Sequence, residues 1–231
     1  MRTPLSLLAL LSCAPGGSDS ASPTLAEGFT RADDGHLHAS ARLGAMTVGP
    51  TGLALRGPGA GPARLSVRTA ALGREALATV PPGEPALGPC TPACEATLRR
   101  PGLEERWALR GAHLSQSWTL LERPAGEGDL RLRVELEGAT LVQGAGSQLQ
   151  VRDAAGDDLR IWGLAAWDAD GVDLPIAAQA EGDGFVLTVD DAGARYPIEI
   201  LLRSIRSMVQ RPGMFLGPTV TLAASPKRSA M

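Results

Sequence analysis

The segment from Asp129 to Glu137 constrains the fold most strongly, because apolar and charged residues alternate along it without a break. Successive side chains of a β-strand point to opposite faces of its sheet, so this alternation separates an apolar face from a charged one. Such a pattern is typical of a half-buried antiparallel strand. The apolar positions are Leu130, Leu132, Val134 and Leu136, and the charged positions are Arg131, Arg133, Glu135 and Glu137.

The same alternation recurs along the chain, and segments rich in glycine and aspartate, typical of turns, separate the recurrences. No stretch beyond Glu27 keeps a helical period. We therefore predict an all-β fold over residues 28–200, an antiparallel β-sandwich built either as one unit or as two packed β subdomains. The further strands are expected at Leu65–Thr69, Trp107–Leu109, Trp118–Leu120, Leu149–Val151, Phe185–Val189 and Tyr196–Ile200.

Residues 81–101 are rich in proline and contain two cysteines, so we expect a long loop there. That loop would divide an N-terminal group of strands (28–80) from a C-terminal group (102–200). Cys90 and Cys94 are expected to form a disulfide in an oxidising compartment. Free thiols and a metal or redox site are the alternatives. The thioredoxin-type redox motif has two residues between its cysteines, whereas three separate this pair.

The chain opens with one arginine, a short apolar run from Leu5 to Leu11, and then Ser12 and Cys13, which together are typical of a secretion signal. The apolar run is too short to span a bilayer. Leu10-Leu11-Ser12-Cys13 resembles the lipobox of bacterial lipoproteins, and this resemblance implies diacylation of the Cys13 thiol. Residues 1–13 are then a signal peptide and residues 14–27 a flexible tether. The alternatives are an ordinary signal cleaved further on and a start-site error.

The resemblance to lipoproteins implies a location as well as an anchor. Ala14 follows the cysteine, and an alanine there resembles the pattern of lipoproteins sent to the outer membrane. We expect the protein to be held at the outer membrane or cell surface by its lipid, and otherwise to be periplasmic or secreted. The net charge of −3 offers no clustered basic face for nucleic acid.

His36 and His38 lie two residues apart, and a third ligand from Asp33 or His113 would complete a zinc site. A solvated pair of histidines beside a turn is the simpler interpretation.

Asp168, Asp170 and Asp173 are similar in spacing to the ligands of calcium loops, but the distal glutamate of an EF-hand is missing. An ordinary hairpin turn is sufficient at this position. No metal and no cofactor is therefore predicted.

Four tryptophans stand out in a chain with only 3% aromatic residues, and we expect them in the core and not on a carbohydrate-stacking surface. They are Trp107, Trp118, Trp162 and Trp167. No nucleophile elbow, zinc-protease motif or phosphate-binding glycine loop is present. The carboxylates are expected in turns and on polar strand faces, so we predict no catalytic residues. A secreted hydrolase is the remote alternative, and it requires His113 or His36 to meet a carboxylate and a nucleophile in a cleft.

Five segments in this order resemble the N-terminal region of large surface proteins of high-GC Gram-negative bacteria, in which such a region precedes FG-GAP, integrin-α-like repeats. The resemblance covers residues 100–200 well and 28–99 loosely, and it implies a surface module without catalytic residues. The segments are Gly102–Arg110, Leu114–Leu120, Arg123–Leu130, Trp167–Gly171 and Ala194–Ile200.

The chain departs from the pattern of these proteins after Ile200, where the family continues with Asp-Pro and the repeats. Residues 201–231 contain no acidic residue and five basic ones. We interpret 201–231 as the product of a truncation or frameshift, or as a genuine basic tail with Leu202, Ile205 and Val209 at helical spacing. The expected function is that of an envelope lipoprotein with a structural or adhesive role, and a polysaccharide- or protein-binding module is the first alternative.

Overall fold

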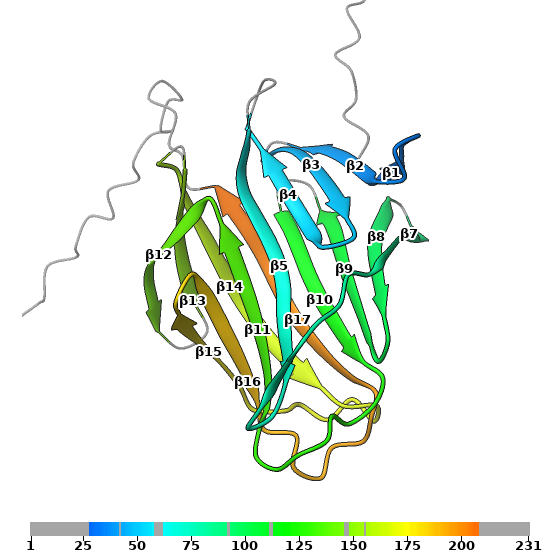
Figure 1. The fold of residues 1–231 in the computed structure, drawn as a ribbon, viewed down its shortest axis with the longest axis vertical. Coiled ribbons are helices and arrows are strands. Elements are labelled where there is room, and N and C mark those ends of the chain that lie inside the picture. The colour runs from blue at the N-terminus through cyan, green and yellow to red at the C-terminus, as the bar shows by residue number, and fades with distance from the viewer. Residues whose placement is uncertain are drawn as a thin grey trace, which may run out of the picture.

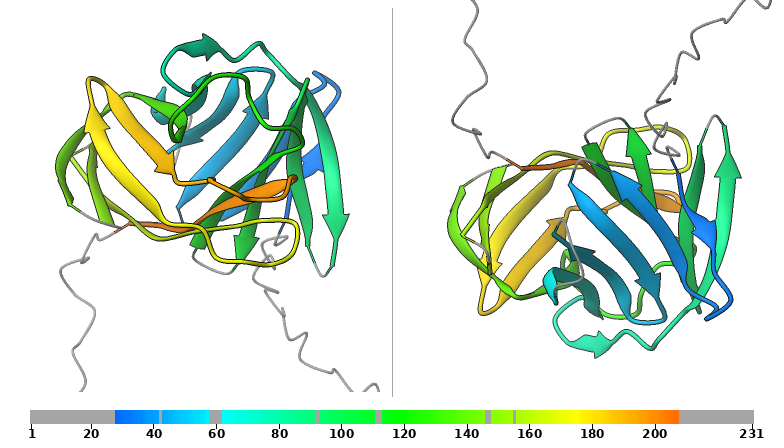
Figure 2. Two further views of the ribbon diagram at one scale, coloured as in Figure 1. Left: turned by 90° about the horizontal axis from the view of Figure 1, so that it is seen from below. Right: turned by 90° about the horizontal axis from the view of Figure 1, so that it is seen from above.

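Two antiparallel β-sheets packed face to face form the protein, as the computed structural model shows for residues 28–41, 43–57, 62–91, 93–110, 113–145, 148–154 and 156–207 (Figure 1). The views from the two ends show the two layers lying over one another (Figure 2). Every pairing between neighbouring strands is antiparallel. The predicted all-β sandwich is confirmed.

Sheet A has nine strands and sheet B has eight within the described residues. In spatial order, sheet A contains β1 (Thr30–Arg31), β2 (Leu37–Ala41), β3 (Gly44–Gly49), β4 (Gly52–Arg56), β5 (Ala63–Gly73), β11 (Leu130–Glu137), β16 (Gly184–Val189) and β15 (Ile176–Glu181), with β6 (Leu77–Thr79) also paired to β5. Sheet B contains β12 (Ala139–Ala145), β13 (Gln148–Asp153), β14 (Asp158–Trp167), β17 (Ile198–Ser207), β10 (His113–Leu120), β9 (Leu103–Arg110), β8 (Cys94–Arg100) and β7 (Glu84–Cys90).

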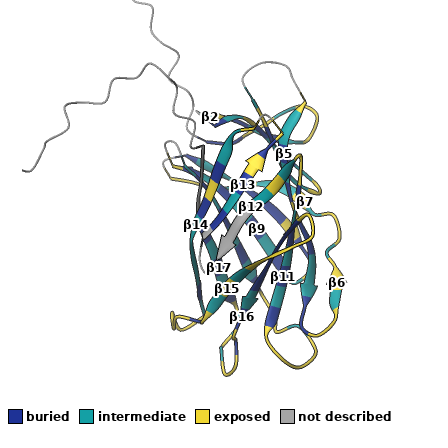
Figure 3. Ribbon diagram, turned by 90° about the vertical axis from the view of Figure 1, so that its left-hand side faces the viewer, coloured by how far each residue is buried: buried dark blue, intermediate teal, exposed yellow. Residues whose placement is uncertain are grey.

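The predicted alternation along β11 is reproduced by its burial, since the four apolar side chains are at most 3% exposed and the charged ones face outward. The other predicted strands correspond to β5, β9, β10, β13, β16 and β17, although β17 begins at Ile198 and not at Tyr196. Figure 3 shows the burial changing from residue to residue along the strands, with exposed residues gathered in the turns. The core is mainly leucine and valine, and Trp107 and Trp118 lie fully inside it.

The prediction of a dividing loop at residues 81–101 is wrong. These residues form the hairpin of β7 and β8 in sheet B, whereas β1 to β5 share sheet A with β11, β15 and β16. Both halves of the chain thus build one sandwich. The prolines Pro85 and Pro89 lie on β7, the edge strand of sheet B, where a missing backbone N–H is tolerated.

The predicted boundary at residue 200 is also wrong, because β17 runs through it to Ser207. Leu201 and Leu202 pair with Ser117 and Gln116 of β10 on one side and with Ala165 and Leu164 of β14 on the other. Leu202 is 2% exposed and belongs to the core. The helical spacing noted in this segment therefore does not describe residues 201–207, which complete the central part of sheet B.

Cys13, the predicted signal peptide and tether (1–27) and residues 208–231, including Val209, lie outside the described residues. In the described part of the chain, no helix is long and apolar enough to cross a membrane.

Candidate functional site

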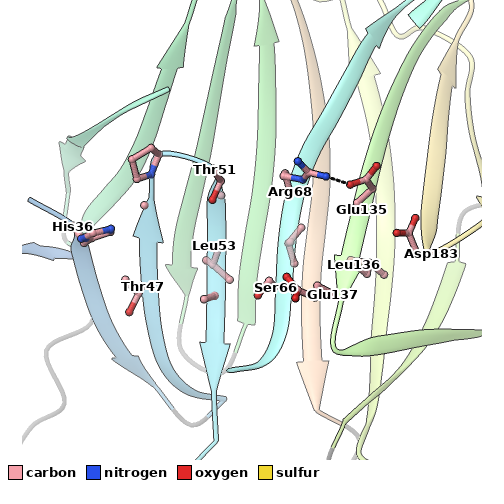
Figure 4. A pocket seen from close by; sticks show the side chains of 15 residues that line it. His36, Thr47, Thr51, Leu53, Ser66, Arg68, Glu135, Leu136, Glu137 and Asp183 are labelled. Atoms are coloured by element: carbon pink, nitrogen blue, oxygen red, sulfur yellow. Dashed lines mark hydrogen bonds and ion pairs between the residues drawn. The ribbon is translucent and has the colours of Figure 1, made fainter. Parts of the chain in front are cut away.

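A groove of about 630 Å3 with a mixed polar and apolar lining lies on the outer face of sheet A, across β3, β4, β5 and β11 (Figure 4). The leucines and valines of these strands point inward to the core, which leaves the small polar positions on the outer face. Its lining consists of His36, Thr47, Gly49, Pro50, Thr51, Gly52, Leu53, Ala54, Ser66, Val67, Arg68, Glu135, Leu136, Glu137 and Asp183.

The floor of the groove follows one cross-strand row of residues. In this row His38 pairs with Thr47, Thr47 with Ala54, Ala54 with Ser66, and Ser66 with Glu137. Neighbouring strands in a sheet are about 4.8 Å apart, so the row from β3 to β11 extends roughly 14 Å. Small side chains in the middle of the row and longer ones at its ends make the surface concave.

Two glycines keep the groove open where the hairpin of β3 and β4 turns. A Cβ atom on Gly49 would lie 2.8 Å from Cδ2 of the His36 ring, and one on Gly52 would collide with the carbonyl oxygen of Val67. The first contact shows that His36 lies directly against the backbone of β3. Any larger residue at either position would displace the wall or the neighbouring strand.

His36 forms the first wall, and Asp34 and His38 lie beside it without lining the groove. Asp34 accepts a hydrogen bond from the backbone N–H of His36 at 2.9 Å, and this bond, helped by His38, lowers the pKa of the Asp34 carboxyl. Asp34 Oδ2 lies 3.3 Å from His38 Nε2 and 3.4 Å from His36 Nδ1. The opposite ring nitrogen of His38 is 3.2 Å from the hydroxyl of Thr47. The partner of the two histidines is thus Asp34, and neither Asp33 nor His113 takes that position.

Charged residues of β5, β11 and the β15–β16 turn form the second wall. Arg68 makes an ion pair with Glu135 (Figure 4). Arg133 Nη2 lies 3.2 Å from Asp183 Oδ1. Glu137 is exposed, and its side-chain carboxylate has no hydrogen-bond or ion-pair partner among the described residues. The groove therefore presents carboxylate oxygens to water, and its arginine is already engaged by a glutamate.

The remaining predicted site residues lie elsewhere. Cys90 and Cys94 form the predicted disulfide, with an S–S distance of 2.07 Å, at the β7–β8 hairpin. Asp168 Oδ1 accepts hydrogen bonds from the backbone N–H groups of Asp170 and Val172, which makes the segment a hairpin turn of the expected kind.

These backbone bonds, with a third from Arg195, lower the pKa of the Asp168 carboxyl. Asp170 forms an ion pair with the Arg195 side chain. The backbone of Asp173 pairs with that of Trp167 in a single antiparallel β-bridge. Within the described residues, no group of three or more histidines, cysteines and acidic residues is arranged to hold a metal ion.

The tryptophans divide into two pairs. Trp107 and Trp118 are fully buried, as predicted. Trp162 and Trp167 are instead half-buried on the outer face of β14, where the ring of His113 meets that of Trp162 edge-on at 6.0 Å.

The expectation that carboxylates occupy only turns and polar strand faces is wrong for Glu105, which lies inside the sandwich and is 0% exposed. Its Oε2 accepts a hydrogen bond from Arg100 Nη1 at 2.6 Å. Its Oε1 accepts bonds from the Thr69 hydroxyl at 2.8 Å and from Gln116 Nε2 at 2.6 Å. Trp118 Nε1 donates to the same Thr69 hydroxyl, so the network joins β5 of sheet A to β9 and β10 of sheet B.

Burial raises the pKa of Glu105, and the bonds from its three partners offset only part of this effect. The sequence contained a signal for this residue, because Glu105 occupies an inward position in the alternation Leu103, Glu105, Trp107, Leu109.

A second buried acid, Asp191, lies at the end of the sandwich near the β5–β6 turn. Its carboxylate accepts two hydrogen bonds from Arg74, at 3.0 and 2.6 Å, and one from the Tyr196 hydroxyl at 2.6 Å. Burial raises the pKa of Asp191, but the hydrogen bonds from Arg74 and Tyr196 outweigh it and the pKa is lowered. Burial and the bond to Asp191 in turn raise the pKa of Tyr196.

The comparisons with known proteins give little support for any family. No family model and no curated protein matches the chain. A solved structure of a glycoside hydrolase family 81 protein from Clostridium thermocellum is similar over 79% of this chain and 25% of its own, with a TM-score of 0.39 and 13% identity. This chain thus spans about a quarter of that protein, and so distant a likeness does not bear on function. The resemblance to FG-GAP repeat proteins stays a prediction.

Proposed function

We propose that the protein is a non-catalytic module of the bacterial cell envelope with a structural or adhesive role, and that its ligand lies in the groove on sheet A. The groove is the observation that carries this proposal. It is concave, it crosses four strands of the sheet, and its volume falls in the range of roughly 300–1,000 Å3 usual for ligand sites.

Its location in the envelope is supported by two features of the sequence and one of the fold. The lipobox ending at Cys13 would provide a membrane anchor. The disulfide between Cys90 and Cys94 is a bond that persists in oxidising compartments and is rare in the cytosol. The motifs between residues 102 and 200 resemble those of FG-GAP surface proteins, which would also be located in the envelope.

A non-catalytic role is supported by how the acidic residues are used. In the groove, Glu135 is paired with Arg68 and Asp183 with Arg133. His36 meets the carboxylate of Asp34, but His113 instead lies against Trp162. The hydrolase alternative requires His36 to act with a nucleophile, so the variant His36→Ala would abolish any hydrolytic activity that the protein has.

The anchor can be tested by expressing the full chain in a Gram-negative host with an alkyne analogue of palmitate. We expect labelling of the wild-type protein in the membrane fraction and no labelling of Cys13→Ala. The double variant Cys90→Ser/Cys94→Ser is the matched control and should still be labelled. A wild-type protein that is soluble and unlabelled would disprove the lipid anchor.

The ligand site can be tested by sedimentation with isolated cell envelopes, using the purified protein in a Cys13→Ala background so that a lipid anchor cannot hold it to the membrane. Ala54 faces outward in the middle of the groove floor, so Ala54→Trp should fill the groove and abolish sedimentation. Ala177 faces outward on β15, away from the groove, and Ala177→Trp should sediment like the wild type. Equal sedimentation of the two variants would place any ligand site elsewhere.

A further inference from the structure

We infer that the groove on sheet A selects a polysaccharide chain that carries no acidic groups. The inference rests on the proposed function and adds the class of ligand to it. The observations behind it are the hydrogen-bonding character, the charge and the lack of exposed apolar anchors in the groove lining.

The lining is rich in groups that accept hydrogen bonds. Thr47, Thr51 and Ser66 contribute hydroxyls, which both donate and accept, and Glu137 contributes an unpaired carboxylate at the end of the floor. The hydroxyl groups of a sugar are donors, and bonds from hydroxyl to carboxylate are short and strong. A polyhydroxylated chain laid across the strands can therefore satisfy the oxygens of the floor and of the second wall together.

The charge of the lining opposes an acidic ligand. Three carboxylates, those of Glu135, Glu137 and Asp183, face the groove. Arg68 pairs with Glu135 and Arg133 pairs with Asp183, whereas the Glu137 side chain has no cationic partner among the described residues. Because Nη2 of Arg68 is already bonded to Glu135, a uronate, sulfate or phosphate group would have to compete with this carboxylate for the guanidinium. An anionic ligand would bring like charges together at the second wall, and such repulsion is how a site rejects a wrong ligand.

The groove also lacks what a protein partner needs. The centres of protein interfaces are well-packed pockets that receive aromatic, arginine or large apolar anchors. Here the large apolar residues of the lining, Leu53, Val67 and Leu136, are at most 3% exposed and belong to the core. Apart from Pro50 and His36, the rest of the lining is composed of small, hydroxyl-bearing and charged side chains, which suits a hydrated sugar chain better than an apolar anchor.

Affinity electrophoresis of the purified protein in native gels gives a direct test. The gels contain dextran, mannan or xyloglucan as uncharged polymers, chitosan as an amino-bearing polymer, or alginate, polygalacturonate or hyaluronan as acidic ones. We expect at least one non-acidic polymer, and no acidic polymer, to retard the wild-type protein. Ala54→Trp should abolish the retardation, and Ala177→Trp should retain it.

Glu137→Gln provides a finer measurement, because it exchanges the unpaired carboxylate for a neutral group of the same shape. A bond to a charged acceptor is stronger than a neutral one by roughly 1 kcal/mol, so binding should weaken about fivefold. Glu122→Gln, at an exposed glutamate away from the groove, should bind unchanged. Unfolding midpoints equal to that of the wild type would show that both variants are folded.

The outcomes separate this inference from the proposed function. Retardation by an acidic polymer, or by no polymer at all, overturns the inference. If Ala54→Trp still loses sedimentation with cell envelopes in that case, the groove is a ligand site for an acidic glycan or a protein, and the proposed function stands. If Ala54→Trp sediments like Ala177→Trp, the proposed function fails as well.

Discussion

The buried network around Glu105 allows a sharp prediction of stability. Arg100 donates to Glu105 Oε2, and both side chains are at most 1% exposed. In Arg100→Met this charge partner is lost, while Thr69 and Gln116 still donate to the other oxygen of the carboxylate. Removing one member of a buried ion pair leaves an uncompensated charge and costs about 3–5 kcal/mol. That is a large share of the roughly 5–15 kcal/mol by which a domain is stable.

The neighbouring residue offers a matched control. Arg99 lies on the same strand and contacts Glu104 at 3.5 Å, but 63% of its side chain is exposed. Exposed ion pairs contribute about 0–1 kcal/mol, so Arg99→Met should be nearly neutral. Urea unfolding followed by the fluorescence of Trp107 and Trp118, which are both buried, would give the free energy of unfolding for each variant.

The pH dependence has a definite sign. The folded-state pKa of Glu105 is raised, so the protonated form is favoured in the fold, and stability falls as the pH rises from the unfolded value, about 4.3, through the folded one. Loss of Arg100 removes a charge that lowers this pKa. The deficit of Arg100→Met relative to the wild type should therefore shrink in acid. If Arg100→Met were as stable as Arg99→Met at neutral pH, the reasoning about desolvation would be refuted.

Three further predictions concern the core, the disulfide and the second buried acid. Leu132→Asp places a charge at a 0% exposed position and should unfold the domain, whereas Arg131→Asp on the outer face should still fold; circular dichroism distinguishes these results. Reduction should add two daltons to the mass of the purified chain, and Cys94→Ser should cost about 2 kcal/mol or less, because the closed loop is short. The lowered pKa of Asp191 adds stability at pH values above the pKa of the unfolded state, about 3.9, and this stability is lost as the pH falls through the folded-state pKa. The melting temperature of Asp191→Asn should therefore change less between pH 5 and pH 2 than that of the wild type.

How far the sequence predicted the fold depended on whether the relevant signal was local. The alternation in β11 and β9 is local, since it reflects one core-facing side of each strand, and it predicted β11 in full and the part of β9 from Trp107 to Leu109. The proline-rich residues 81–101 misled because proline disfavours a central strand but not an edge strand, and sequence alone does not say which strands are edges. The strand was predicted to end at residue 200 because the segment that follows is basic, although the apolar positions of residues 201–207 continue the strand.

The candidate site was harder to predict because it is made by pairing between distant segments. The contact of Thr47 with Ala54 follows from one hairpin. The pairing of Ser66 with Glu137 joins residues far apart in the chain, and the bulge in the β5–β11 register changes which side chains meet. The order of strands in sheet A determines this pairing, and no periodicity along either strand encodes that order.

In this sandwich the carboxyl group that is buried and the carboxyl group that a ligand can reach belong to different residues. This difference is the strongest physical argument for a binding role. A general acid or base needs a carboxyl group whose protonation is tuned by its surroundings and which a substrate can still reach. Glu105 is desolvated, but Arg100, Thr69 and Gln116 occupy its oxygens, and it is absent from the lining of the groove. Glu137, by contrast, lines the groove and is exposed to water. The acid held away from water thus links the two sheets through its hydrogen bonds, while the accessible one is suited to accept hydrogen bonds from a ligand.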